Sequence, residues 1–188
     1  MDSIHFSKLL QTNRLILRKF KPEDAREIVN ILQDKEVAST TLMLPYPCTL
    51  EESKKIIASY LDEQKHYKTM RWAIILRDNN KFIGGIRLVP NNRFNSAEIG
   101  FWLGKEFWRN GYTFEAAEVV IRFGFNELKL NRLEAHAMTE NMSSVKLLEK
   151  LGFNQEGYHP DLVIKWDEYK DVITFGLLRK NFIMINNN

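Results

Sequence analysis

Residues 98–138 read EIGFWLGKEFWRNGYTFEAAEVVIRFGFNELKLNRLEAHAM, and they set the topology of the chain. The first residues alternate as in a strand, an amphipathic helix begins at Gly111-Tyr112-Thr113, and RLEAHAM at 132–138 predicts another strand. The apolar stripe of the helix is formed by Ala117, Val120, Ile121, Gly124, Phe125 and Leu128. A strand, a helix and a strand in this order predict a right-handed crossover between two parallel strands.

The segments before this stretch predict strands and two helices. WAIILRD, KFIGGIRLVP and SAEIGFWLG follow one another and predict an antiparallel meander, with a polar turn at 78–80. RLILR at 14–18 predicts an edge strand, and Pro22 opens a helix that extends to residue 33. Thr49 and Glu52 form a capping box that predicts the start of a second helix, whose residues Ile56, Ile57, Tyr60 and Leu61 point inward.

The segment after residue 138 predicts one more helix and two last strands. SSVKLLEKL at 143–151 has helical spacing, and Gly152 ends it. Strands are expected near 153–159 and 170–178, and the tail NFIMINNN is expected to fray. The element order β-α-α-β-β-β-α-β-α-β-β therefore predicts an α/β protein, an α+β mixed sheet with helices on both faces.

Composition sets the class of protein. A chain of 188 residues with 44% apolar residues predicts a single domain over 1–188. One cysteine, Cys48, and four scattered histidines give neither a disulfide nor metal-ligand spacing. Without a signal peptide or a run of 18 apolar residues, the expected protein is soluble and cytoplasmic, with no membrane partner. A net charge of +3 on dispersed side chains argues against nucleic-acid binding.

The helix that starts at Gly111 has no Ser, Thr or Asp as its N-cap, so several backbone N–H groups lack an acceptor. Such a helix start suits a phosphate, because the helix dipole adds positive charge there; the other reading is an ordinary glycine turn. The sequence contains neither Gly-x-Gly-x-x-Gly nor Gly-x-x-x-x-Gly-Lys-Ser/Thr, which argues against Rossmann proteins and nucleotide hydrolases.

The wider string at 98–157 resembles the GNAT superfamily of acetyl-CoA-dependent N-acetyltransferases, and within it the branch of ribosomal-protein (Rim-type) N-acetyltransferases. The resemblance rests on a strand ending Gly-Phe-Trp-Leu, the turn 108–113, the pair Glu115-Ala116, Asn141-x-x-Ser144 and Leu151-Gly152-Phe153. TNRLILRKFKPEDA at 12–25 is similar to the opening of the same branch. The resemblance implies the acyl-CoA N-acyltransferase fold, a mostly antiparallel sheet with one splayed parallel strand pair.

The resemblance also implies how acetyl-CoA binds. Backbone N–H groups of Arg109, Asn110, Gly111, Tyr112 and Thr113 would hold the CoA pyrophosphate, and the backbone of Phe101, Trp102 and Leu103 would bind the pantetheine arm and the thioester oxygen. Asn141 and Ser144 belong to the same implied site. The family pattern Gln/Arg-x-x-Gly-x-Gly/Ala has Trp108 and Thr113 at its first and last positions here, and many relatives have Gly where Arg109 stands. Arg109 either contacts a CoA phosphate or is a solvated surface residue.

Three side chains are catalytic candidates. Glu98 is either a general base, its pKa raised by apolar neighbours, or an ion-paired structural carboxylate. Ser144, at the third position of a helix capped by Asn141, is implied to act with a carboxylate, for which Asp161 is the closest acid in the sequence. Many GNAT enzymes have a Tyr as the acid where this chain has Leu148, and Tyr158 is a weaker substitute.

The implied function is direct acetyl transfer, without a metal, to a primary amine in a ternary complex. At pH 7 an α-amine is roughly 10% neutral and a Lys amine below about 0.1%, which favours a protein or peptide N-terminus. A small amine such as an aminoglycoside or polyamine is the alternative acceptor, and a non-catalytic acyl-CoA sensor is the alternative of another class. Either a monomer or a homodimer is compatible with the sequence.

Overall fold

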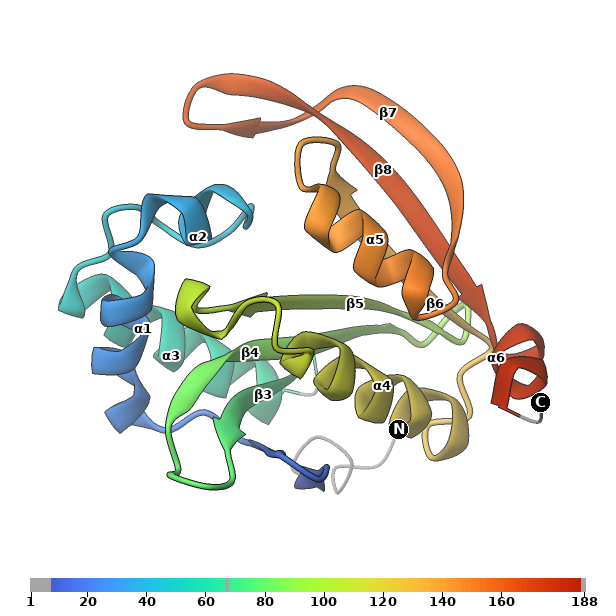
Figure 1. The fold of residues 1–188 in the computed structure, drawn as a ribbon, viewed down its shortest axis with the longest axis horizontal. Coiled ribbons are helices and arrows are strands. Elements are labelled where there is room, and N and C mark those ends of the chain that lie inside the picture. Colours follow the sequence, from blue (N-terminus) through green and yellow to red (C-terminus); the bar gives the residue numbers. More distant parts are fainter. Residues whose placement is uncertain (1–7, 67, 187–188) are drawn as a thin grey trace.

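An eight-stranded sheet in the order β1-β2-β3-β4-β5-β6-β8-β7 runs through the molecule (Figure 1). This computed structural model describes residues 8–66 and 68–186. The strands are β1 Leu10–Gln11, β2 Leu15–Arg18, β3 Met70–Leu76, β4 Phe82–Asn91, β5 Ser96–Leu103, β6 Arg132–Met138, β7 Asn154–Lys165 and β8 Glu168–Leu178. Every neighbouring pair is antiparallel except β5 and β6, which are parallel, so the predicted mixed sheet is confirmed.

Helices cover both faces of this sheet, as predicted (Figure 1). They are α1 Ala25–Leu32, α2 Lys35–Ser39, α3 Leu50–Lys65, α4 Tyr112–Asn126, α5 Met142–Lys150 and α6 Arg179–Asn186, with 3-10 turns at Pro22–Asp24 and Lys105–Phe107. Among the described residues, none of these helices is long and apolar enough to cross a membrane.

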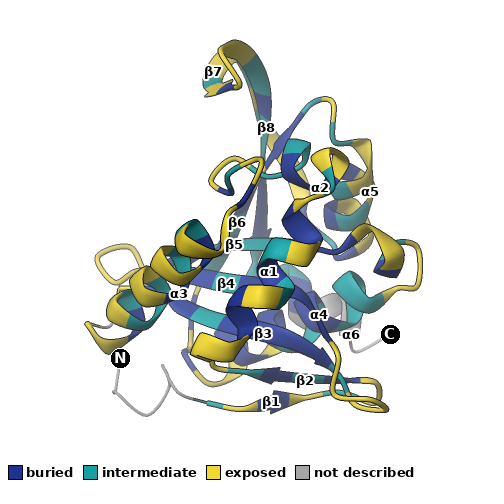
Figure 2. Cartoon of the chain, turned by 90° about the vertical axis from the view of Figure 1, so that its left-hand side faces the viewer, coloured by how far each residue is buried: buried dark blue, intermediate teal, exposed yellow. Residues whose placement is uncertain are grey.

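A hydrophobic core lies on each face of the sheet, between the strands and the helices that cover them. Figure 2 shows the buried strands that lie between the two cores. The larger core packs α4 and α5 against the sheet. It contains the apolar side chains of the predicted stripe, Ala117, Val120, Ile121 and Phe125 of α4 and Leu128 just after the helix. The smaller core packs α1, α2 and α3 on the opposite face, where Ile57 of α3 is buried. Alternation along β5 assigns Ile99 to the first core and Trp102 to the second.

Some elements differ from the prediction. β1 lies outside β2, so 14–18 is not the edge strand, and residues 22–24 form a 3-10 turn before α1. The described part of the tail expected to fray, residues 181–186, belongs to α6, and residues 187–188 lie outside the described residues. β7 continues past the predicted end to residue 165, and β8 begins at residue 168 rather than 170. The added residues are mostly exposed, so they show little of the alternation from which a strand is predicted.

The parallel pair separates soon after it forms. β5 and β6 pair only through Ser96 with Arg132, Ala97 with Leu133 and Glu98 with Glu134. Beyond these pairs β5 continues along β4 and β6 along β8, so residues 99–103 and 135–138 face each other unpaired. The sheet therefore divides between β5 and β6, and backbone polar groups there are open to a ligand.

Candidate functional site

The turn before α4 presents a row of unpaired backbone donors. Arg109 and Gly111 have φ of 62° and 77°, in the left-handed region, and no side chain caps the helix. The first N–H of the helix with a backbone acceptor is that of Glu115, which donates to Gly111. Within the described residues the N–H groups of 109–114 have no acceptor, so this turn is suited to an anion.

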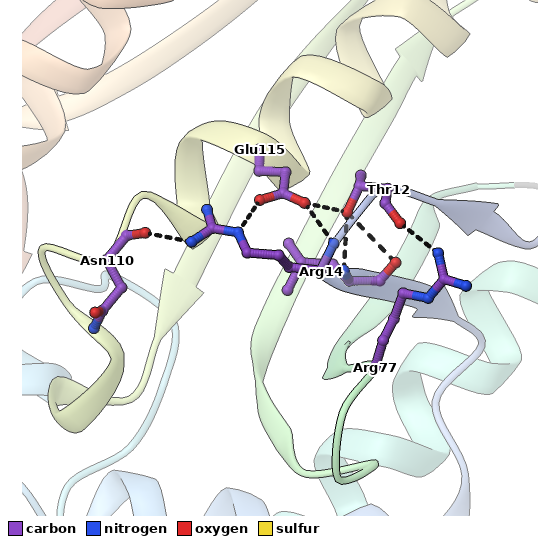
Figure 3. A network of polar contacts seen from close by, with 6 residues as sticks. Thr12, Arg14, Arg77, Asn110 and Glu115 are labelled. Carbon is purple, nitrogen blue, oxygen red and sulfur yellow. Dashed lines mark hydrogen bonds and ion pairs between the residues drawn. The ribbon is translucent and has the colours of Figure 1, made fainter.

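Arg14 of the N-terminal segment holds this turn in place (Figure 3). Its Nη1 donates to the carbonyl of Asn110 at 3.0 Å, its Nε donates to Glu115 at 2.6 Å, and its guanidinium lies 4.6 Å from the ring centre of Tyr112. Glu115 also accepts from Thr12 Oγ1 and from the backbone N–H of Arg14. Burial acts to raise the pKa of Glu115, but these hydrogen bonds outweigh it and the pKa is lowered.

A cavity of about 630 Å³ opens where β5 and β6 separate. Its walls come from residues 40–44, from α3, from β4, β5 and β6, and from the first turns of α5. Predicted site residues Glu98, Phe101, Trp102, Asn141 and Ser144 line it together. The cavity thus joins the unpaired strand edges to a space large enough for a second ligand.

Glu98 lies in this cavity as one member of an ion pair. Its Oε1 accepts from Arg87 Nη2 at 2.7 Å, and its Oε2 lies 3.8 Å from Nδ1 of His136. Arg87 can lie over β5 because the residue opposite is Gly100, where an added Cβ would be 2.9 Å from Arg87 Nε. The neighbour of this carboxylate is therefore a guanidinium rather than the expected apolar side chains, and Oε2 remains available to a hydrogen-bond donor.

A second ion pair lies beside the first, so that Glu63, Arg71, Arg87 and Glu98 form a row of charges. Arg71 lies directly opposite Arg87 across β3 and β4, and its Nε and Nη2 both donate to Oε2 of Glu63 on α3. The ring of Tyr60 covers the Arg71 guanidinium at 4.2 Å. Burial raises the pKa of Tyr60, while the charges of Arg71 and Arg87 both act to lower it.

The start of α5 is built as the sequence predicts. Oδ1 of Asn141 accepts from the backbone N–H of Ser144 at 3.1 Å, and Nδ2 of Asn141 reaches the carbonyl of Thr40 at 3.4 Å. Ser144 lines the cavity, and its hydroxyl has no partner within the described part of the chain. Leu148, one turn later, is buried and lines the same cavity.

Asp161 is not brought to this site. It lies exposed in β7 with φ of 48°, and its backbone N–H donates to Asp171 of β8. Tyr158 also donates to Asp171, and this hydrogen bond is the main reason why the pKa of Tyr158 is raised. Neither Asp161 nor Tyr158 is among the described residues that line the cavity.

The tip of the β7–β8 hairpin contacts the loop that borders the cavity. Nζ of Lys165 donates to the carbonyl of Leu44 at 3.3 Å, and Trp166 lies against Tyr46 and under the ammonium group of Lys35. Burial lowers the pKa of Lys165. The hairpin and the N-cap of α5 therefore both hold the segment 40–46, of which residues 40–44 form one wall of the cavity.

Several polar residues of the site went unnoticed in the sequence. Arg71, Arg87 and His136 have no motif around them, and only the strand register brings them to their places. Arg14 belongs to the segment 12–25, but nothing in that segment indicates its bonds to Asn110 and Glu115. Within the described residues no group of three His, Cys, Asp or Glu side chains is placed to hold a metal ion.

Comparison with known proteins gives consistent matches. The acetyltransferase (GNAT) domain family matches residues 14–154. The chain is similar to the uncharacterised N-acetyltransferase p20 of Bacillus licheniformis, with 33% identity over 92% of this chain and 97% of that protein.

Two solved structures share the fold. One is a ribosomal-protein-S5-alanine acetyltransferase from Vibrio fischeri, with 21% identity, a TM-score of 0.80 and coverage of 94% of this chain and 99% of that one. The other is a spermidine N-acetyltransferase from Vibrio cholerae bound to CoA and spermine, with 22% identity, a TM-score of 0.79 and coverage of 92% and 99%.

Proposed function

The chain belongs to the acetyltransferase (GNAT) family, and we propose that it is a Rim-type member that acetylates the N-terminal α-amine of a protein or peptide. Its general activity, transfer of an acetyl group from acetyl-CoA to an amine, follows from the family. The acceptor and the residue roles below are our proposal.

The observation that carries the proposal is the uncapped turn together with the separated strands. The N–H groups of 109–114 suit the CoA pyrophosphate, because they lack acceptors among the described residues and lie at the positive end of α4. The unpaired edges of residues 99–103 and 135–138 suit the amide-bearing pantetheine arm. Acetyl-CoA supplies the activated acetyl group, and the backbone of Phe101, Trp102 and Leu103 would orient its thioester.

Two side chains that line the cavity would each carry out one proton transfer, from the acceptor and to the leaving group. Glu98 would take a proton from the acceptor ammonium, directly or through water, on the Oε2 that Arg87 does not engage. The hydroxyl of Ser144 would donate a proton to the departing sulfur and recover one from solvent. Asp161 is left out of this scheme, because it lies on the exposed hairpin outside the cavity lining.

The acceptor is argued from chemistry, since the fold occurs with both kinds of acceptor. A base such as Glu98 has little power to deprotonate a Lys ammonium at neutral pH, whereas roughly 10% of an α-amine is already neutral. The α-amine of a peptide therefore reacts in this site with less help than a lysine or a polyamine would.

The test combines thiol release from acetyl-CoA with calorimetry of CoA binding. The acceptor panel contains peptides with free N-termini, the same peptides with blocked N-termini and one Lys, polyamines and aminoglycosides. We expect turnover on free N-termini and none on the blocked Lys peptides. Turnover confined to polyamines or aminoglycosides would contradict the proposed acceptor, and CoA binding without turnover on any amine would favour a sensor.

A further inference from the structure

We propose that the acceptor carries a carboxylate close to its amine, and that Arg71 and Arg87 bind this carboxylate on the floor of the cavity. This inference rests on the acetyltransfer reaction proposed above, because it assigns a specificity to the acceptor half of the same cavity. It names a class of amine that neither the fold nor the family selects.

The first observation is that two arginines lie side by side on one face of the sheet. Arg71 and Arg87 are directly opposite each other on β3 and β4, and both side chains line the cavity. Like charges at directly opposite positions destabilise a strand pair. Glu63 pairs with Arg71 at one end of the row and Glu98 pairs with Arg87 at the other, and these ion pairs offset the repulsion between the arginines.

The second observation is that the flanking carboxylates leave guanidinium donors free. Both bonds from Arg71 go to one oxygen of Glu63, and its Nη1 has no acceptor among the described residues. Arg87 uses only Nη2 toward Glu98, so its Nε and Nη1 are also without an acceptor in the described part of the chain. A carboxylate has the acceptor geometry that such planar donors prefer.

The third observation is the balance of charge in the cavity. Its described lining contains the cations Lys55, Arg71 and Arg87 against the carboxylates Glu63 and Glu98. Each carboxylate is already paired with an arginine, whereas Lys55 forms no ion pair within 4 Å among the described residues and has only the charge of Glu52, on the same helix, acting on it. A polycation such as spermidine would meet an excess of positive charge, and an amine with a carboxylate would meet its complement.

The geometry also sets how far apart the two groups of the acceptor are. Arg87 and Glu98 are in contact at 2.7 Å, so an amine at Oε2 of Glu98 and a carboxylate at Arg87 are near neighbours. A peptide brings its α-amine and a carboxylate this close together when its first or second residue is acidic. A small molecule does so when it is an amino acid.

The experiment compares acid and amide forms of otherwise identical acceptors. Peptides with Asp or Asn at the second residue, and free amino acids with their carboxamides, are assayed for kcat/KM, and binding to the enzyme–CoA complex is measured by calorimetry. We expect the wild type to prefer the acid form by about tenfold or more, since a charge-assisted bond is lost in the amide. Arg71→Gln should reduce this ratio to near one, and Arg71→Lys should recover part of it.

Arg93→Gln is the control, because Arg93 is exposed in the β4–β5 turn and outside the cavity lining. It should keep the wild-type ratio. If free amino acids turn over and peptides do not, and the preference for acid over amide is lost in Arg71→Gln, the carboxylate site is supported and the peptide acceptor is contradicted. Equal binding and turnover of acid and amide forms, with the N-terminal reaction intact, overturns this inference alone.

Discussion

Two residues with positive φ, Arg109 and Gly111, turn the chain so that successive N–H groups face outward before α4. Glycine adopts this conformation without cost, and Asn tolerates it better than other side chains. A Cβ at Gly111 would lie 3.5 Å from Nη2 of Arg14, which is an ordinary contact, so a side chain has room there.

We therefore expect Gly111→Asp to lower the affinity for CoA by about tenfold or more relative to Gly111→Asn, because only Asp adds a negative charge where a phosphate would bind. Calorimetry with CoA measures both variants, and thermal unfolding shows that both are folded. Equal affinities of the Asp and Asn variants for CoA would show that no phosphate of CoA binds at this turn.

Ser144 is separable from its neighbour Ser143, which is exposed and outside the cavity lining. If the hydroxyl of Ser144 protonates the departing sulfur, Ser144→Ala lowers kcat by about tenfold or more and changes KM for acetyl-CoA less. Ser143→Ala should leave both constants unchanged. A kcat of Ser144→Ala equal to that of the wild type would exclude Ser144 from catalysis.

Among the elements, α4 depends on its contact with the N-terminal segment. Glu115 accepts hydrogen bonds from Thr12 and Arg14, and its pKa is lowered from the usual 4.5 although burial opposes this. A carboxyl group with a lowered pKa in the folded state stabilises the fold fully above about pH 4.5, and this contribution is lost as the pH falls through the folded-state pKa.

Glu115→Gln should accordingly cost about 1–3 kcal/mol in free energy of unfolding at pH 7, and less as the pH falls toward 3. Urea unfolding at pH 7, 5 and 3 measures this. Glu118→Gln, in an exposed pair with Arg122, is the matched control and should change stability by less than about 0.5 kcal/mol. A cost for Glu115→Gln that stays constant with pH would show that ionisation of Glu115 does not matter.

The elements that the sequence predicts correctly have a local cause. Thr49 and Glu52 make the predicted reciprocal capping bonds, and Gly152 has φ of 87° just after α5. Of the elements that escaped prediction, β1 and α2 contain two and five residues, too few to show a period. Asp34 was an available signal for α2, since its side chain accepts from the N–H of Glu36.

For the molecule as a whole, the uncapped turn before α4 and the separated strands could be anticipated from motifs, but the row of arginines and carboxylates in the cavity could not. The reason is a register shift between Ile74 and Ile75, where β4 carries one extra residue. Counting back from the β3–β4 turn without this bulge places Arg71 opposite Ile86 instead of Arg87. A slip of one residue moves every side chain to the other face, so the two arginines would appear on opposite sides of the sheet.

Amide exchange gives a test that concerns the entire sheet. We expect CoA to slow exchange at 99–103 and 135–138, where β5 and β6 face each other unpaired, and to leave the paired core of β3 unchanged. Hydrogen–deuterium exchange with and without CoA measures this. Protection confined to other segments would mean that the coenzyme does not enter between these strands.

The three residue pairs that join β5 to β6 also bear on how long the protein survives. A coenzyme that fastens the two halves of the sheet binds only the folded chain, and at a hundred times its dissociation constant it adds about 2.7 kcal/mol to stability. Proteases act on the opened chain, and about 2.7 kcal/mol of added stability lowers the population of that opened chain by about a hundredfold. Proteolysis of this enzyme would then become slower as the concentration of acetyl-CoA rises.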